Sequence, residues 1–388
     1  MLCVFEFPPG DAEWQLRDLA NALQGRVRGL RIEFCYGFLK SYKPGGLSLR
    51  RISNGIFVHI RAFVRCLLGS YSVVLVRSSP PLIQITIALA ARLRGMPYWV
   101  WLMDAHPEIE QVEWGRIWGV GWLLRRLQDV NASCLSGAEV VVVPDQAMSD
   151  RFVRAVTSDR ILICPTWGNG TCAPISGRPA SKSAPEAKGL NFAYIGNLGF
   201  AHDVPLLCRF LVQCANRVPV EISFISTSRE AVASFQERLG EAKITVRWRP
   251  RVPDFLNLLA VIREAEFDYG IVIMSEQFAG LLSPSKFIGY LAGDLPIIYL
   301  GPANTNAAVA CDRFQAGVRM DATMFDSNGA NLVEMIIARD GSETMRRNIA
   351  AVLAHFAQYN GEYLAREILR QTAALGVRAP EPARQGPS

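Results

Sequence analysis

The strongest constraint on the fold is a regular alternation of short apolar runs with helical patterns, which occurs in two successive stretches of the chain. Apolar strands separated by amphipathic helices are typical of βαβ units, in which the strands run parallel in one sheet. Between the stretches lies a segment rich in Gly, Pro, Ser and Ala that holds almost no large apolar residue, as expected of a linker. The sequence therefore predicts an α/β protein with two domains, each built on a parallel sheet.

We expect Rossmann-like domains over residues 1–167 and 190–376, a linker over 168–189 and a frayed tail over 377–388. Whether the last helices return to the first domain stays open. Ligands of open parallel sheets bind beyond the carboxyl ends of the strands, so the domains are expected to face across a cleft. The expected strands lie at 2–5, 30–34, 73–76, 98–103, 139–143 and 160–164 in the first domain, and at 191–195, 220–225, 244–248, 268–273 and 296–300 in the second.

The composition is that of a folded chain from a reducing compartment. Of the 388 residues, 50% are hydrophobic and 20% are charged, which excludes a largely disordered protein. The longest apolar stretch, at 78–91, falls short of the ~20 residues that a membrane-spanning helix needs. The first residues carry no positive charge and include Glu6, which favours a first strand over a signal peptide. The nine cysteines form no CxxC pair, which favours free thiols over a zinc site. We therefore expect a cytoplasmic protein.

Positive charge is concentrated in the first half, where residues 26–94 hold twelve basic residues and a single acid, Glu33. A basic amphipathic helix predicted at 50–68 either lies on an anionic membrane surface or packs its apolar stripe on the core with its arginines in water. The Trp- and Arg-rich segment 114–126 favours the membrane, although its tryptophans could equally be core. No known nucleic-acid module accompanies the charge. The apolar stripe consists of Ile52, Ile56, His59, Ile60, Phe63 and Leu67, with Arg50, Arg51, Arg61 and Arg65 elsewhere.

Candidate site residues of the first domain follow its strands. Gly10 ends the first strand and could bring the backbone close to a ligand, although an ordinary turn explains it as well. Asp104, His106 and Glu108 crowd together just past the strand at 98–103. A carboxylate and an imidazole at a strand end suit acid–base chemistry on a hydroxyl group, whereas the alternative for Asp104 is to cap the next helix.

In the second domain, Gly196, Asn197 and Gly199 lie between a strand and a helix expected to begin near Asp203. Free backbone N–H groups and the positive end of that helix suit phosphate oxygens, and His202 would face the same anion; a plain turn is the alternative.

The segment SPSKFIGYLAGDLPII at 283–298 is the strongest candidate. Pro284 suits a first helical turn, which would aim the N–H groups of Ser285 and Lys286, and the Lys286 ammonium, beyond the preceding strand. A diphosphate would complement this arrangement, whereas a lysine without this context is usually a solvated surface group.

Six segments resemble, in family order, the GT-B glycosyltransferases of family 4, in particular their PSK-motif subgroup. They cover most of the chain from Val4 to about Gly317: FPPG with DLA, RSSPP, WLMDAHPE, VVVPDQAM, YIGNLGFAHD and PSKFIGYLAGDLPII. The resemblance implies an acceptor-binding N-terminal domain, a nucleotide-sugar-binding C-terminal domain, no metal or other cofactor, and retention of anomeric configuration.

The resemblance also implies roles for the candidates. Gly196, Asn197, Gly199, His202 and Asp203 occupy the stretch where relatives grip the donor diphosphate, and Ser285 with Lys286 match the second diphosphate contact. Asp104 matches a catalytic His or Asp, with Gly10, His106 and Glu108 on the acceptor side. Many relatives carry a glutamate at two positions that are Leu281 and Gly289 in this sequence, and Glu276 could compensate for this departure. Asp294 stands where the motif usually has glycine.

Together these features predict a glycosyltransferase that uses a nucleotide sugar. Lys286, His202 and two helix N-termini would stabilise the departing diphosphate, and Asp104 would orient or deprotonate the acceptor hydroxyl. The basic first half favours an acceptor on polyprenyl diphosphate and peripheral attachment to the inner face of the cell membrane, in the assembly of bacterial surface polysaccharide. A non-catalytic nucleotide-sugar-binding module and a nucleotide-sugar epimerase are the alternatives.

Overall fold

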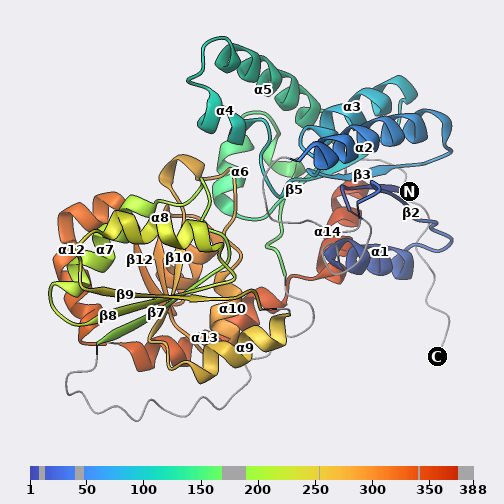
Figure 1. Cartoon of the computed structure of the whole chain (residues 1–388). Coiled ribbons are helices and arrows are strands. Elements are labelled where there is room, and N and C mark those ends of the chain that lie inside the picture. The colour runs from blue at the N-terminus through green and yellow to red at the C-terminus, as the bar shows by residue number, and fades with distance from the viewer. Residues whose placement is uncertain (8–13, 40–47, 168–188, 253, 340, 375–388) are drawn as a thin grey trace, which may run out of the picture. The chain divides into compact units, whose positions relative to one another are not determined.

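The computed structural model describes residues 1–7, 14–39, 48–167, 189–252, 254–339 and 341–374. It consists of two compact units, each built on a six-stranded parallel sheet (Figure 1). The expected linker, apart from residue 189, and the expected tail lie outside the described residues. Unit 1 comprises Met1–Asn169, Gly280–Ser283 and Gln358–Ser388, and unit 2 comprises Gly170–Ala279 and Pro284–Ala357.

The sheet of unit 1 has the order β2-β1-β3-β4-β5-β6. Its central strands are buried almost throughout, and β5 along its whole length, because helices cover both faces of a parallel sheet. Every strand expected in this half overlaps an observed one. The strands are β1 (Leu2–Val4), β2 (Glu33–Cys35), β3 (Val74–Arg77), β4 (Tyr98–Trp101), β5 (Val140–Val143) and β6 (Ile161–Ile163).

One face of this sheet is covered by the first and the last helix of unit 1. Their apolar residues share a core with Trp101, which stacks on Trp167 at 5.4 Å between ring centroids. Asp18 joins the two helices, because its Oδ2 accepts from Trp167 Nε1 (2.9 Å) and Gly361 N (2.8 Å). The helices of unit 1 are α1 (Trp14–Arg26), α2 (Leu49–Leu68), α3 (Ile83–Arg94), α4 (Glu108–Trp114), α5 (Val120–Ser136), α6 (Gln146–Phe152), η1 (Ser158–Arg160) and α14 (Gly361–Ala374).

Helix α2 does not fit the second of the two alternatives left open for it, in which its apolar stripe packs on the core while its arginines face water. Ile52, Ile56 and Ile60 are exposed. The helix instead buries small and polar side chains, because it packs closely on α3 and on the edge strand β2. The four residues buried by α2 are Asn54, Val58, Ala62 and Cys66.

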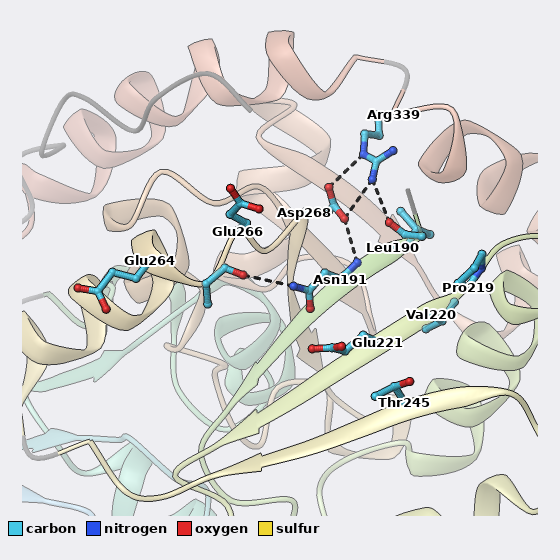
Figure 2. Close-up of a pocket in the computed structure, with 12 residues that line it drawn as sticks. Leu190, Asn191, Pro219, Val220, Glu221, Thr245, Glu264, Glu266, Asp268 and Arg339 are labelled. Carbon is cyan, nitrogen blue, oxygen red and sulfur yellow. Dashed lines mark hydrogen bonds and ion pairs between the residues drawn. The ribbon is translucent and has the colours of Figure 1, made fainter. Parts of the chain in front are cut away.

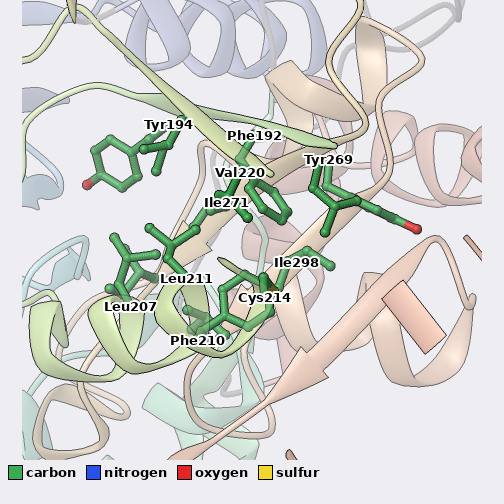
Figure 3. Close-up of a cluster of buried hydrophobic side chains, with 14 of the residues drawn as sticks. Phe192, Tyr194, Leu207, Phe210, Leu211, Cys214, Val220, Tyr269, Ile271 and Ile298 are labelled. Atoms are coloured by element: carbon green, nitrogen blue, oxygen red, sulfur yellow. The ribbon is translucent and has the colours of Figure 1, made fainter. Parts of the chain in front are cut away.

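The sheet of unit 2 has the order β12-β11-β10-β7-β8-β9. Aromatic side chains of the central strands pack against α7 in its core, as Figure 3 shows for Phe192 and Phe210. All five strands expected here are present, whereas β12 was not predicted because its four residues, GVRM, form a short edge strand interrupted by Arg319. The strands are β7 (Leu190–Ile195), β8 (Val220–Ile225), β9 (Ile244–Arg249), β10 (Tyr269–Ile273), β11 (Ile297–Leu300) and β12 (Gly317–Met320).

The helices of unit 2 begin at capping residues that the sequence marks. Asp203 caps α7, where its Oδ1 accepts from Leu206 N at 2.9 Å, and Ser228 and Asp321 cap α8 and α12 in the same way. The helices are α7 (Val204–Ala215), α8 (Arg229–Leu239), α9 (Phe255–Glu264), η2 (Glu276–Phe278), α10 (Phe287–Ala292), α11 (Asn306–Ala308), η3 (Val309–Arg313), α12 (Ala322–Ile337) and α13 (Ser342–Ala357).

Replacing Asp18 by alanine should destabilise unit 1, because two hydrogen-bond donors lose their shared acceptor. We expect a loss of about 1–3 kcal/mol in the free energy of unfolding. Seven of the eight tryptophans lie in unit 1, so urea unfolding followed by tryptophan fluorescence reports on this unit.

The matched control is Glu362→Ala, which removes an exposed ion pair with Arg26 between the same two helices. This change should cost less than about 1 kcal/mol. Equal effects of the two substitutions would contradict the role assigned to Asp18.

Candidate functional site

At the carboxyl edge of the unit 2 sheet, the loops that follow β7 and β10 are joined. Ser275 N donates to Ala201 O at 2.8 Å, and the rings of Phe200 and Phe278 meet edge to face at 5.4 Å. The two loops meet because β7 and β10 are neighbours in the sheet. This edge therefore gathers the glycine-rich loop at 196–203 and the segment that leads to Lys286.

Lys286 lies directly against Gly196. A Cβ atom built on Gly196 would come within 2.9 Å of Lys286 Nζ, and the glycine has a φ of +92° that other residues rarely adopt. The ammonium donates to Asn197 O at 3.3 Å and lies 5.3 Å from the centre of the Tyr194 ring. Burial lowers the pKa of Lys286 to about 8, so the group is held as a poorly solvated cation at neutral pH.

His202 shares this environment. Its ring lies 6.1 Å from that of Tyr194, and its Nδ1 lies 2.8 Å from Gly199 N and 3.0 Å from Gly199 O. Burial, together with the charge of Lys286, lowers the pKa of His202 to about 4, so the imidazole is neutral at pH 7. In the tautomer whose Nδ1 accepts from Gly199 N, Nε2 carries the proton and can donate to a ligand; in the other tautomer, Nδ1 donates to Gly199 O. The structure thus brings Lys286 and His202 together beside Gly196.

The expectation of free backbone N–H groups in this loop is wrong for two of its three residues. Gly196 N donates to Ile225 O at 2.8 Å, because the pairing of β7 with β8 continues past the end of the strand. Gly199 N donates to His202. Asn197 is exposed, but its carbonyl already accepts from Lys286 Nζ and from the Tyr194 hydroxyl. An anion here would be bound by side chains rather than by a nest of N–H groups.

The two helix N-termini also differ from expectation. The carboxylate of Asp203 caps α7, and Pro205 in the first turn has no N–H. Helix α10 begins only at Phe287, so Pro284 and Ser285 precede the helix rather than forming its first turn. With six residues, α10 is too short for a strong dipole. Asp203 is therefore a capping residue, and the cation of Lys286 is the dominant positive charge near Gly196.

Arg319, in β12, lies at the carboxyl edge of the unit 2 sheet. It was not among the predicted site residues, because β12 was not predicted. It is bound by Asp312 (2.8 Å) and Asp321 (2.9 Å). Glu276 lies in η2, beyond β10, with its side chain exposed. Burial and the charge of Asp321 raise the pKa of Glu276. With one arginine against three carboxylates, this group adds no net positive charge to the edge of the sheet.

Asp104 lies at the carboxyl edge of the unit 1 sheet, just beyond β4. Ser78 Oγ, at the end of the neighbouring β3, accepts from the backbone N–H groups of Met103 (2.9 Å) and Asp104 (3.3 Å). Asp104 does not cap α4, whose N-cap is Pro107. Solvent reaches Asp104, yet the protein around it raises the pKa of its carboxyl, because desolvation outweighs the attraction of His106 and Arg77.

His106 and Glu108 join two different interactions. His106 Nδ1 is 2.6 Å from Glu110 Oε1, one helical turn away. Burial alone would lower the pKa of His106, but its hydrogen bond to Glu110 and that residue's charge raise it. Glu108 is buried and accepts from Asn131 Nδ2 at 3.3 Å, which indicates a structural role. Gly10 lies outside the described residues.

Glu6 is a buried carboxylate at the same edge, after β1, that the sequence analysis did not select. It accepts from Ser79 Oγ (2.7 Å) and pairs with Arg51 of α2 (3.3 Å). Its side chain is only 2% exposed, so it fixes α2 and the turn after β3 to the end of β1. The signal in the sequence was an acid directly after an apolar strand.

Leu281 and Gly289 occupy the two positions at which the sequence resemblance leads us to expect glutamates, and their side chains are apolar or absent. Leu281 is fully buried, and its carbonyl accepts from Ala105 N at 2.9 Å within unit 1. A Cβ on Gly289 would make only ordinary contacts, so the helix has room for a side chain there. Asp294 has a φ of +58°, which explains why glycine suits this position in the motif.

A hollow of about 490 Å³ lies elsewhere on unit 2, at the opposite edge of its sheet (Figure 2). It is lined by the amino ends of β7 and β8 and by Asp268, which is bound by Arg339 (3.0 Å) and by Asn191 N (2.9 Å). Because ligands of parallel sheets bind at the carboxyl ends, this hollow is separate from the candidate site.

No protein-family model matches the chain, and no curated protein matches it in sequence. Solved structures match it over nearly its whole length. The structure of Anabaena HepE in complex with UDP is 14% identical, with a TM-score of 0.60 over 96% of this chain and 99% of HepE. The lipopolysaccharide outer core galactosyltransferase WaaB is 11% identical, with a TM-score of 0.59 over 97% of this chain and 100% of WaaB. Sucrose-phosphate synthase from Thermosynechococcus elongatus is 14% identical, with a TM-score of 0.63 over 97% and 98% of the two chains.

At sequence identities of 11–14%, the similarity to these structures establishes the fold alone. The chain has the α/β architecture of the GT-B glycosyltransferases, as the sequence predicted.

The pKa of His202 should depend on Lys286. NMR titration of the four histidines should show His202 near pH 4, and Lys286→Met should raise that value while leaving it below 6.5, because burial remains. His59 belongs to unit 1 and serves as the control, since its low pKa arises from burial. A His202 pKa that is unchanged in Lys286→Met would contradict the geometry described here.

The pKa of His106 should respond to Glu110 in the opposite direction. Glu110→Gln should lower the His106 pKa, because the hydrogen-bonded negative charge is lost while burial stays, and Asp104 and Glu108 remain as weaker groups that raise it. The same titration measures this change, with His59 again as the control. A His106 pKa that stays raised would show that another group holds its proton.

Proposed function

We propose that this protein is a glycosyltransferase that binds a nucleotide sugar at the carboxyl edge of unit 2 and transfers the sugar to an acceptor. The observation that carries the proposal is Lys286, held against Gly196 beside His202. Two structural neighbours add support, since HepE was solved with UDP and WaaB is a galactosyltransferase.

In this proposal Lys286 and His202 stabilise the leaving group. The bond between the anomeric carbon and the diphosphate oxygen breaks, and negative charge grows on the nucleoside diphosphate. The Lys286 ammonium is a donor already in place, and so is the Nε2–H of His202 in the tautomer whose Nδ1 accepts from Gly199 N, so little reorganisation is needed when that charge develops. Their low pKa values fit this role, because an anion would restore the solvation that both groups lack.

Asp104 is proposed to receive the acceptor. Its carboxyl orients the attacking hydroxyl or takes its proton as the new glycosidic bond forms, and its raised pKa makes it a better base near neutral pH. Glu110 is proposed to orient His106 beside Asp104.

Retention of configuration and independence from metal ions stay predictions. Transfer activity in excess EDTA checks the independence from metal ions.

The acceptor is proposed to be a glycan carried on polyprenyl diphosphate, in the assembly of bacterial surface polysaccharide. The apolar exposed face of α2 and the basic first half of the chain support a lipid-linked substrate and a position at the inner face of the cell membrane. Anionic groups of such an acceptor would meet Arg51 and Arg77, whose charges act on Asp104.

A non-catalytic module that binds a nucleotide sugar is the second candidate, because Leu281 and Gly289 replace two glutamates of the family pattern. Such a module would bind the donor without transferring or hydrolysing it. An epimerase, the third candidate, would convert its donor with no acceptor present.

A thermal-shift panel of UDP-, GDP- and dTDP-sugars should identify the donor, because a ligand that binds only the folded state raises its stability. At a concentration of about 100 times Kd, the gain is ~2.7 kcal/mol. Lys286→Ala should abolish most of this shift and reduce transfer or donor hydrolysis about 10²–10³-fold.

The control is Lys243→Ala, which removes an exposed lysine before β9, at the amino edge of the same sheet. This variant should behave like the wild type. A strong shift with no turnover of any donor would favour the non-catalytic module, and no shift with any nucleotide sugar would refute the proposal.

A further inference from the structure

The outer face of α2 carries no charge after the first turn of the helix. Its exposed positions there are apolar except for a single serine, and Ile60 and Leu68 are 61% and 80% exposed. A helix on the surface of a water-soluble domain normally places polar side chains there. The exposed residues of α2 after its first turn are Ile52, Ser53, Ile56, Phe57, Ile60, Val64 and Leu68.

Three of the four arginines of α2 turn inward instead. Arg61 Nη1 donates to Tyr36 O at 2.9 Å, and Arg65 Nη1 donates to Phe34 O at 3.2 Å, next to the edge strand β2. Arg51 pairs with the buried Glu6. These arginines attach α2 to the domain and leave its apolar face exposed. On this face Phe57 meets the ring of Phe38, itself exposed, edge to face at 5.8 Å.

A second group of exposed apolar residues lies where the chain passes from α4 to α5. Trp118, in the turn between these helices, is 98% exposed, and Trp114 and Trp122 are exposed on either side of it. Since α2 packs on α3, α3 on α5 and α5 on α4, the two groups belong to one helical layer. We call the exposed apolar residues of this layer the apolar helical surface: Leu49, Ile52, Ile56, Phe57, Ile60, Val64, Leu68, Leu89, Leu93, Trp114, Ile117, Trp118, Trp122, Leu123 and Val130.

The charges around this surface are mostly positive. Six arginines of the layer are exposed, against two exposed acids from the same four helices, Glu113 and Asp129. Tryptophan and arginine side by side suit the boundary between lipid headgroups and acyl chains, where one part of each side chain is apolar and the other is wet. The exposed arginines are Arg50, Arg92, Arg94, Arg116, Arg125 and Arg126.

We propose that the apolar helical surface docks on a lipid bilayer that contains anionic phospholipids. The apolar residues enter the headgroup region and the exposed arginines contact the lipid phosphates. No helix among the described residues has the length and hydropathy to cross a membrane, so α2 would lie in the plane of the surface.

The apolar helical surface lies close to the candidate acceptor residues of unit 1. Arg51, in the first turn of α2, pairs with Glu6 at the carboxyl edge of β1, the edge at which Asp104 follows β4. A lipid-anchored acceptor would therefore meet unit 1 where its candidate acceptor residues lie. Docking itself does not depend on the transfer reaction and is measured without donor or acceptor.

The test is flotation of the full chain with vesicles of phosphatidylglycerol and phosphatidylcholine, compared with phosphatidylcholine alone. The wild type should float with the mixed vesicles and at least tenfold less with the neutral ones. Ile56→Ser with Ile60→Ser, and separately Trp118→Ser, should each reduce flotation at least tenfold. Because these side chains are exposed, the thermal midpoint and the nucleotide-sugar shift should not change.

Leu256→Ser is the matched control, since Leu256 of unit 2 is 63% exposed, close to the 61% of Ile60. This variant should float like the wild type. Equal flotation of all variants, equal binding to neutral vesicles, or no binding would overturn the proposal. So would a wild-type dimer by light scattering that the Ile56 and Ile60 substitutions dissociate, because the surface would then bind a second copy. A failed nucleotide-sugar shift with intact flotation would count against the proposed reaction alone.

Discussion

The contact of Lys286 with Gly196 is the interaction on which the candidate site depends. An ammonium that packs on a backbone with no side chain, beside the Tyr194 ring, loses water on several sides. Its hydrogen bond to Asn197 O offers a dipole in place of a full negative charge. Such a cation is costly to keep in the unliganded protein, and an anionic ligand is the partner that would best restore what burial removes.

The arrangement also explains the state of His202. Burial disfavours a charged imidazole and the nearby Lys286 cation adds to this effect, so the ring stays neutral at pH 7. The site therefore holds one charged donor and one neutral imidazole, both in place before any ligand arrives. Fixed donors are the form of electrostatic help that a breaking bond to diphosphate can use.

Much of the fold could be predicted from the sequence, because strands buried on both faces appear as unbroken apolar runs such as VVVV in β5. Strand β12 could not, since an edge strand of four residues with an arginine inside has no such signature. For α2 the periodicity identified the apolar stripe but could not show whether the stripe faces the protein or the solvent. Only tertiary contacts, such as that of Arg61 with Tyr36 O, reveal that the polar side faces the protein.

In the candidate site too, some features could be predicted from the sequence and others could not. Residue types after strands led to Lys286, His202 and Asp104, because polar groups at strand ends gather at one edge of a parallel sheet. The hydrogen bonds of the loop could not be predicted, since they depend on how far β7 pairs with β8 and on the rotamer of His202. Glu6 was missed because a single acid after a strand gives no sign that an arginine on a distant helix will reach it.

Calorimetry of UDP binding near pH 8, in buffers of different ionisation enthalpy, tests the central claim most directly, because it counts the protons exchanged on binding. The pKa of Lys286 is about 8, so the free group is about half protonated at this pH, and a bound diphosphate should complete its protonation. The account predicts net uptake of about half a proton by the wild type and none by Lys286→Ala. UDP binding without proton uptake, or with equal uptake by both proteins, would contradict it.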